Sequence, residues 1–346
     1  MNNTNPQNEA RELLQSVALS VWEQQAGLAV TADAKSVAAD WRGSDCATIA
    51  RAMQRVNAPA GVQATASPLL DFDFVRLAGI AVETGMAGAW EKQLANFAWM
   101  RGLGLLDFRE NSLLTIAPDG FLEVAEGNPI LPGLPAVTKE SAYLKTYARL
   151  YKIGERLFEA DQSGVFIRLG QQFALSAAAK QADIAYGVLI ENPALADGQP
   201  WLSVDAGNQA PTGQNYSTPL TEQNLDNALA GLRAQRLNGL RLNLSARYLL
   251  VGADEELASR RLVRDLVTAG ELTVIVEDRL TGHGFYLIAD PEIMPTVARL
   301  SLTASKHPVD ITASRSGAAM ALEIRASADM GAAPMSRVGI YWTPRQ

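Results

Sequence analysis

The chain has 346 residues, of which 48% are hydrophobic and 19% charged, a balance that supports a large folded core and argues against extensive disorder. Lysine and arginine total 30 against 37 for aspartate and glutamate, and the net charge of −7 argues against tight charge-driven binding of nucleic acid, although not against enclosing it. One cysteine, Cys46, excludes an internal disulfide framework and a multi-cysteine metal site. The polar start and the lack of a long apolar run predict a protein that is soluble inside a cell.

The N-terminal part of the sequence predicts helices. Apolar residues recur at helical spacing from Glu9 to Gln25 and weakly from Cys46 to Val56, and a stretch rich in Ala, Gly, Ser and Pro follows. Residues 1–67 are therefore predicted to form a separate helical appendage. The next segment, Asp71–Met100, is predicted to be helical, as one long helix or as two shorter helices because three glycines weaken it.

Strand patterns begin after Gly102. Leu113–Ile116 and Phe121–Val124 flank a Pro-Asp-Gly turn and predict a hairpin. From Tyr143 to Lys152 the residues alternate, which predicts a strand with two different faces. We expect one face to be buried, with Leu144, Thr146, Ala148 and Leu150, and the other to be amphipathic and cationic, with Tyr143, Lys145, Tyr147, Arg149 and Tyr151.

A long helix is predicted from Ser163 to Ile190, ended by Asn192-Pro193. Its inner stripe includes Val165, Leu169, Gln172, Phe173, Ser176, Ala179, Ala182, Ala185, Tyr186 and Leu189. Residues 193–220 are predicted to be loop. The remainder alternates: helices starting at Thr221 and capped by Asp254, and strands at Tyr248–Val251, Leu272–Val276, Gly284–Ile288, Ala319–Arg325 and Arg337–Trp342. The order predicts an α+β fold with an inserted α/β layer.

The sequence contains no recognisable catalytic motif. It lacks a phosphate-binding glycine loop and a nucleophile elbow, and its two histidines, His283 and His307, are predicted to lie in turns. The acidic group at Asp254 is typical of a helix N-terminus, and Glu277-Asp278 would need a second acid nearby for glycosidase chemistry. The loop around Asp197-Gly198 does not match the spacing of a calcium site. We therefore predict no catalytic residue, cofactor or metal.

The cationic face of the strand at 143–152 is the best candidate functional surface. Aromatic and basic residues in alternation can form a stacking platform for single-stranded nucleic acid. On a sheet face, tyrosine and arginine more often form contacts between subunits. We predict subunit-interface roles for Tyr143, Lys145, Tyr147, Arg149 and Tyr151.

Several segments, taken in order, resemble a known family. They are Lys145–Arg149, Ile153–Arg156, Glu159–Phe166, Asn192-Pro193, Leu195–Gly198, Tyr248–Val251, Val276–Leu280 and Tyr286–Pro291. The chain resembles the major capsid (head) proteins of tailed bacteriophages with the HK-ninety-seven-like fold, and is most similar to the Mu-like head subunits. The resemblance covers about residues 68–346 by order of segments.

The resemblance implies an α+β fold with an N-terminal arm (68–112), an E-loop hairpin (113–158), a peripheral domain with a long spine helix (159–195 and 300–346) and an axial domain (196–299). It implies a shell subunit that forms pentamers and hexamers of an icosahedral head, encloses double-stranded DNA without reading its sequence, and contacts portal, scaffold or decoration proteins. We expect assembly in the host bacterial cytoplasm, a place in the virion, and no membrane contact.

Two alternatives remain open at the level of sequence. An encapsulin-like cellular compartment would use the same fold as a phage shell. A soluble hydrolase acting through carboxylates belongs to a different class. Particle size separates the second from the others, because a compact monomer favours the enzyme and megadalton particles favour a shell.

Overall fold

The structure is a computed structural model that describes residues 72–124, 130, 132–154, 164–211, 220–266, 272–305, 308–316 and 321–345. The predicted appendage at 1–67 and His307 lie outside the described residues. Two compact units divide the chain. Unit 1 contains residues 1–95, 146–179 and 305–329, and unit 2 contains residues 96–145, 180–304 and 330–346.

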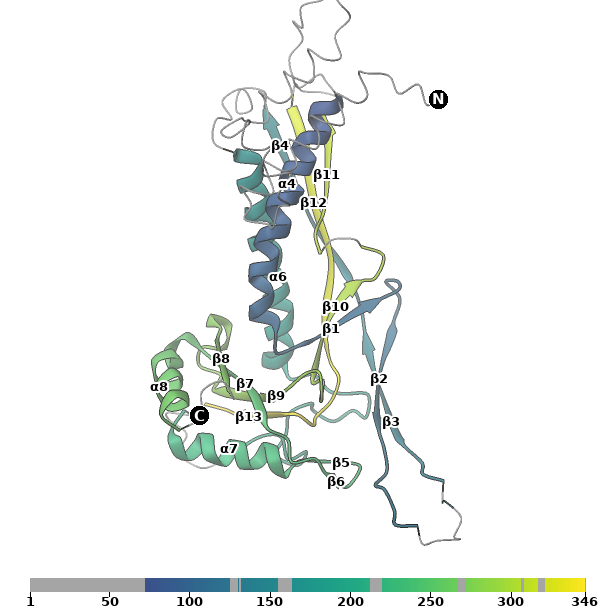
Figure 1. Ribbon diagram of the computed structural model, residues 1–346, viewed down its shortest axis with the longest axis vertical. Helices are drawn as coiled ribbons and strands as arrows, with labels where there is room; N and C mark the ends of the chain where they lie inside the picture. Colours follow the sequence, from purple (N-terminus) through teal and green to yellow (C-terminus); the bar gives the residue numbers. More distant parts are fainter. Residues whose placement is uncertain are drawn as a thin grey trace, which may run out of the picture. The chain divides into compact units, whose positions relative to one another are not determined.

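Unit 1 packs helices against a sheet. Its described elements are α4 (Phe72–Gln93), most of β4 (Lys145–Gly154), the first half of α6 (Val165–Glu191), β11 (Asp310–Arg315) and the first part of β12 (Ala321–Pro334) (Figure 1). The first of these, α4, is one long helix of 22 residues, which resolves the alternative left open by the sequence. Helix α6 has 27 residues and confirms the predicted long helix.

The glycines of α4 and α6 explain how the two helices meet. A Cβ atom on Gly170 would lie 2.0 Å from the carbonyl oxygen of Val82, and one on Gly85 would lie 2.3 Å from that of Ile167. Only glycine allows this approach of backbone to backbone. Gly85, one of the three glycines that weaken the helical propensity of α4, therefore allows the close packing of α4 on α6.

Unit 2 contains further paired strands. After the 3-10 turn η2 (Leu94–Phe97), β1 (Arg101–Leu105) pairs in parallel with β10 (Val297–Leu302), and β10 pairs antiparallel with Met330–Pro334 of β12. Strands β1, β10 and β11 are not predicted by the residue patterns of the sequence. Two further strands, β2 (Asn111–Ala117) and β3 (Ala136–Ala142), run side by side as an antiparallel ribbon (Figure 1).

A second, four-stranded sheet of unit 2 has the order β13-β9-β7-β8. Its strands are β13 (Ile340–Thr343), β9 (Phe285–Ala289), β7 (Ala246–Val251) and β8 (Thr273–Val276), and it packs with α7 (Glu222–Ala234) and α8 (Glu256–Leu266). The short elements are β5 (Arg236–Leu237), β6 (Leu240–Arg241), η3 (Ala253–Glu255) and η4 (Asp278–Leu280). The core includes Leu225, Ala228 and Leu232, the predicted inner face of α7.

Two sequence predictions about local structure are wrong, and a third places a strand correctly but makes it too short. Phe121–Val124 is not a strand, because β2 pairs with Ala136–Ala142 instead. Asp254 does not cap a helix; Gly252 precedes η3, and the Asp254 carboxylate pairs with Arg345. The strand predicted at 319–325 is part of β12, which has 14 residues. In the first two cases a partner distant in sequence decides the local structure.

Candidate functional site

The five predicted interface residues do not all lie on one strand. Lys145, Tyr147, Arg149 and Tyr151 occupy alternate positions of β4, while Tyr143 lies in the break between β3 and β4. Tyr143 and Tyr151 are 52% and 47% exposed, Lys145 and Arg149 are exposed, and Tyr147 is half-buried. Neither Lys145 nor Arg149 has an ion-pair partner among the described residues.

Side-chain pairs reveal how β4 lies on β12. Thr146 donates a hydrogen bond to Asp329 at 2.6 Å, and Lys152 pairs with Glu323 at 2.9 Å. Because the second pair is six residues later on β4 and six earlier on β12, the strands run antiparallel with these residues opposite one another. The bond from Lys152 also lowers the pKa of Glu323, with a smaller contribution from Ser316.

The predicted burial of this segment is correct only in part: Leu144, expected to be buried, is buried just before β4 begins. Thr146, Ala148 and Leu150, expected to be buried, are exposed. The opposite face shares its side of the sheet with Leu322 and Ile324, which are buried. On that face the Tyr151 ring packs on Phe173 of α6, with centroids 5.3 Å apart, and Ile153 is buried. The cationic face is therefore the one turned toward α6.

A second surface with exposed apolar side chains lies on the ribbon of β2 and β3 and was not predicted from the sequence. Leu114, Ile116 and Val137 share one face, are 57%, 61% and 56% exposed, and Ile116 is directly opposite Val137. We call these three residues the ribbon patch. One feature of the sequence could have predicted this patch. Leu113, Leu114 and Ile116 place apolar side chains on both faces of one strand, and such a strand is normally buried on both faces.

The base of the ribbon is anchored in unit 2. Leu113 and Ala142 are buried with Leu144, Leu300 and Met335. Buried Glu140 accepts a hydrogen bond from the Ala196 backbone N–H at 2.9 Å. Beyond β2, the Asp119 carboxylate accepts from the Leu134 backbone N–H at 2.8 Å and from the Asn238 side chain at 2.7 Å. The ribbon is thus held in place while its patch stays open.

Two of the acids that the sequence analysis weighed as functional residues, Glu277 and Asp197, are paired with arginines. Arg279 donates to Glu277 at 2.6 Å and to Asp183 at 2.7 Å. Arg337 holds Asp197 through two hydrogen bonds of 2.5 and 2.8 Å, and these lower the Asp197 pKa to about 2. Among the described residues no group of three or more His, Cys, Asp or Glu side chains is placed to hold a metal ion. These contacts are structural cross-links between loops and elements.

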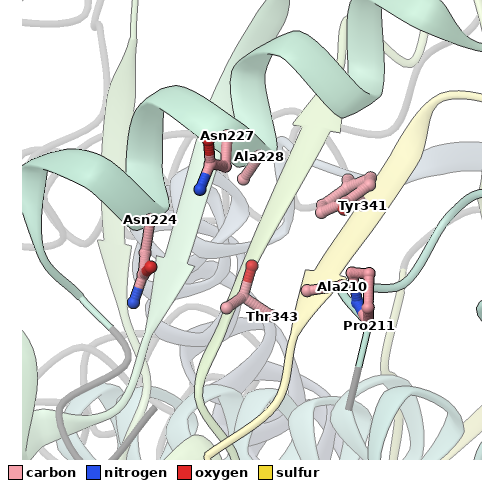
Figure 2. Close-up of a pocket in the computed structure, with 7 residues that line it drawn as sticks. All are labelled: Ala210, Pro211, Asn224, Asn227, Ala228, Tyr341 and Thr343. Atoms are coloured by element: carbon pink, nitrogen blue, oxygen red, sulfur yellow. The ribbon is translucent and has the colours of Figure 1, made fainter. Parts of the chain in front are cut away.

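One pocket of about 200 Å³ lies between α7 and β13. Figure 2 shows Asn224 and Asn227 on α7, and Tyr341 and Thr343 on β13; Ala210, Pro211 and Ala228 complete the lining. Thr343 is 1% exposed, and its hydroxyl has no hydrogen-bond partner among the residues that the structure describes. The pocket contains no acid, base or nucleophile pair that could carry a reaction.

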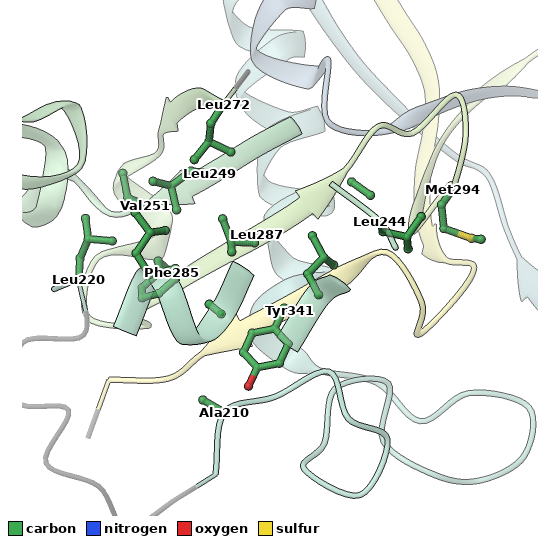
Figure 3. Packing of buried hydrophobic residues seen from close by; sticks show 14 residues of the cluster. Ala210, Leu220, Leu244, Leu249, Val251, Leu272, Phe285, Leu287, Met294 and Tyr341 are labelled. Atoms are coloured by element: carbon green, nitrogen blue, oxygen red, sulfur yellow. The ribbon is translucent and has the colours of Figure 1, made fainter. Parts of the chain in front are cut away.

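Tyr341, which lines this pocket, also belongs to the hydrophobic core of the four-stranded sheet. Figure 3 shows Tyr341 beside Phe285 and Leu287, with Leu249 and Val251 on the neighbouring strand. His283 lies in the predicted turn: its N–H donates to the Leu280 carbonyl, and glycines with positive φ flank it. None of the helices in the described ranges has the length and apolarity needed to cross a bilayer.

Comparison with known proteins gives one family. The profile of the family described as "Phage capsid protein" matches residues 138–343, more than half of the chain. A search of curated proteins found no match.

Solved structures that align include the capsid of Ralstonia phage GP4 (TM-score 0.49, 8% identity, 71% of this chain and 86% of that one). The capsid of an empty GTA particle aligns with a TM-score of 0.47 and 10% identity over 88% of this chain and 98% of that one. Microbacterium phage Oxtober96 gives a TM-score of 0.43 and 12% identity over 72% of this chain and 90% of that one.

The match of the family profile decides between the classes left open above. It covers β4, α6 and the whole four-stranded sheet of unit 2, and the observed α+β order agrees with the predicted capsid fold. The carboxylate-dependent hydrolase is therefore set aside. The chain belongs to the phage capsid protein family and is a major capsid protein, a structural component of the virion shell and not an enzyme.

Proposed function

We propose that many copies of this chain assemble as pentamers and hexamers into the icosahedral head of a tailed phage or prophage, and that the head encloses double-stranded DNA. One observation supports this: of the 19 large hydrophobic residues that are exposed in the described part of the chain, 13 fall between Leu106 and Tyr151. Such a concentration marks surfaces that bind other proteins. The net charge of −7 is compatible with enclosing DNA without tight binding.

Each region of the chain has a proposed role in the shell. Residues 68–112 act as an N-terminal arm, 113–158 as the E-loop, 159–195 with 300–346 as the peripheral domain, and 196–299 as the axial domain. The appendage at 1–67 acts as a scaffold-like segment or internal arm. Portal, scaffold or decoration proteins are the expected partners, the Mu-like head subunits the expected relatives, and the bacterial cytoplasm the place of assembly.

The interface residues proposed for assembly are Tyr143, Lys145, Tyr147, Arg149 and Tyr151. The exposure of Lys145 and Arg149 without an ion-pair partner in the described residues supports this role, since arginine and tyrosine are enriched where subunits meet. Tyr151 also packs on Phe173 of its own chain, so its contribution to a neighbour would come from the exposed part of the ring.

Electron microscopy of the purified full-length protein tests the proposal. Wild-type protein is expected to form closed particles of megadalton mass, whereas protein that stays a compact monomer under all assembly conditions contradicts the proposal. The double variant Tyr147→Ala, Arg149→Ala is expected to give folded subunits and few particles. A matched control, Arg260→Ala on the exposed face of α8, removes a surface arginine outside the proposed interface and should assemble normally. Normal particle yield from the double variant contradicts the interface assignment.

A further inference from the structure

Three arginines at one end of α7 carry positive charge that nearby acids do not neutralise. Arg233 lies in the last turn of α7, and Arg236 and Arg241 lie on β5 and β6, which follow that helix (Figure 1). All three side chains are exposed, and none forms an ion pair with the residues that the structure describes. The segment 233–247 contains four arginines and no acid. We call Arg233, Arg236 and Arg241 the arginine patch.

A tight turn fixes two of these arginines side by side. Strands β5 and β6 are joined by Asn238-Gly239, whose φ angles of 49° and 81° are those of a type I′ turn. The register places Arg236 directly opposite Arg241. Like charges in this position destabilise a pair of strands. Leu237, on the other face of β5, packs against the hydrophobic core and holds the hairpin in place. The fold therefore retains a repulsion that a bound anion would remove.

One acid contacts the turn without pairing with an arginine. The Asp119 carboxylate accepts hydrogen bonds from the Asn238 side chain at 2.7 Å and from the Leu134 backbone N–H at 2.8 Å. Three cations thus face this one acid. The position of Arg233 has a structural explanation of its own, because a cation at the C-terminal end of a helix is favourable. That explanation does not extend to the two opposed arginines on β5 and β6.

The composition of this surface favours phosphate over the surface of another protein. Protein interfaces gather aromatic and apolar side chains at their centre. Among the described residues, no large exposed hydrophobic side chain lies between Val204 and Leu257. Exposed Asn238, Asn243 and Ser245 surround the arginines instead. Surfaces that bind nucleic acid are polar and positively charged, and the planar guanidinium matches the geometry of a phosphate group.

We infer that the arginine patch binds phosphate groups of the double-stranded DNA inside the head, without reading its sequence. The inference rests on the proposed function, because it names the surface that contacts the enclosed DNA. Three contacts are too few for tight binding by one subunit, which agrees with the net charge of −7. In a shell the patch is repeated in every copy, and linked weak sites bind far more strongly than one site alone.

Fluorescence anisotropy with a short DNA duplex of random sequence tests the inference on full-length subunits at low salt. The variant Arg233→Gln, Arg236→Gln, Arg241→Gln is expected to bind the duplex more weakly than wild type. Each phosphate contact contributes about 0.9 to the slope of log K against log salt concentration, so the variant should lose about 2.7 of that slope. Wild-type subunits that do not bind the duplex at low salt overturn the inference.

A control with the same change of charge separates the patch from the net charge of the chain. The variant Arg260→Gln, Arg261→Gln, Arg264→Gln removes three exposed arginines of α8, two of which pair with acids of that helix. It should bind DNA as wild type does. Equal losses in the two triple variants overturn the inference. Binding of poly-glutamate to the patch as tightly as DNA also overturns it, because the partner would then be an acidic protein.

Chemical modification of unaltered protein gives a second measurement, which does not depend on the folding of variants. Phenylglyoxal, which reacts with arginine side chains, is applied to particles with and without DNA, and the modified sites are mapped by mass spectrometry. Arg236 and Arg241 should react in empty particles and be protected in filled ones. Equal reaction in both, or protection in both through contacts between subunits, overturns the inference while the proposed function stands. Failure of the unmodified chain to form particles contradicts the proposed function itself.

Discussion

Single residues of this protein act mainly as cross-links between distant parts of the chain. Arg279 joins Asp183 of α6 to Glu277, and Arg337 joins the loop at Asp197 to the segment before β13. Glu277 and Asp197, two acids that could suggest chemistry in the sequence, are thus paired with arginines. The planar guanidinium suits this role because it donates to several oxygens at fixed geometry.

The pair of Asp197 and Arg337 gives a prediction about pH. The hydrogen bonds from Arg337 lower the Asp197 pKa from 3.8 to about 2. A lowered folded-state pKa means that the stabilisation is complete above the unfolded pKa and is lost as pH falls through the folded value. Asp197→Asn should therefore flatten the pH dependence of unfolding between about pH 4 and pH 2, measured by urea denaturation. An unchanged slope, with Asp205→Asn as the control, contradicts the assignment.

Phe173 is predicted to be a main contributor to the stability of unit 1. It is 6% exposed on α6 and its ring packs against Tyr151. Truncating a buried aromatic residue costs about 3–5 kcal/mol, so Phe173→Ala should give misfolded or much less stable subunits. Leu175→Ala, on the same helix but 45% exposed, should change the free energy of unfolding far less. Equal effects of the two changes in chemical denaturation would mean that Phe173 is not part of the core.

At the scale of elements, two glycines of α6 should respond oppositely to the same substitution. A methyl group at Gly170 would meet the backbone of α4, whereas one at Gly187 would meet nothing within 4 Å. Gly170→Ala should destabilise the subunit by about 1–3 kcal/mol through overpacking. Gly187→Ala should stabilise it by about 0.5–1 kcal/mol because alanine favours helix. Thermal unfolding of both variants measures the signs, and shifts in the same direction contradict the backbone contact at Gly170.

Some helices and strands are predictable from the sequence, and others are not. Helices α6 and α7 are predicted correctly because apolar spacing is a local signal, and in the structure Thr221 caps α7. The partner of β2 and the exposed face of β4 depend on residues far away in the sequence. Alternation identified the two faces of β4, but it could not say which one α6 would cover. The ribbon patch was not predicted because the exposure of its three side chains depends on which other segments of the chain pack against the ribbon, and the local sequence does not contain that information.

At the scale of the whole molecule, the exposed apolar residues indicate a subunit that is incomplete alone. The ribbon patch and Phe121–Val124 both lie within the segment 106–151 and leave large apolar side chains in water. Covering such a patch contributes roughly 25 cal/mol for each Å² removed from water. Spread over many copies, modest contacts of this kind can hold a shell together while each subunit remains able to fold before it assembles.

The ribbon patch therefore provides a test that separates folding from assembly. In the variant Leu114→Ser, Ile116→Ser, Val137→Ser the base of the ribbon keeps its buried contacts, because Leu113 and Ala142 are unchanged. We expect normal circular dichroism and a thermal unfolding temperature close to wild type, but no particles by light scattering and electron microscopy. The control Leu257→Ser, Ile293→Ser removes apolar residues of similar exposure elsewhere in unit 2 and should still assemble. Particles from the triple variant in normal yield, or loss of assembly in the control, would show that the patch has no special part in building the shell.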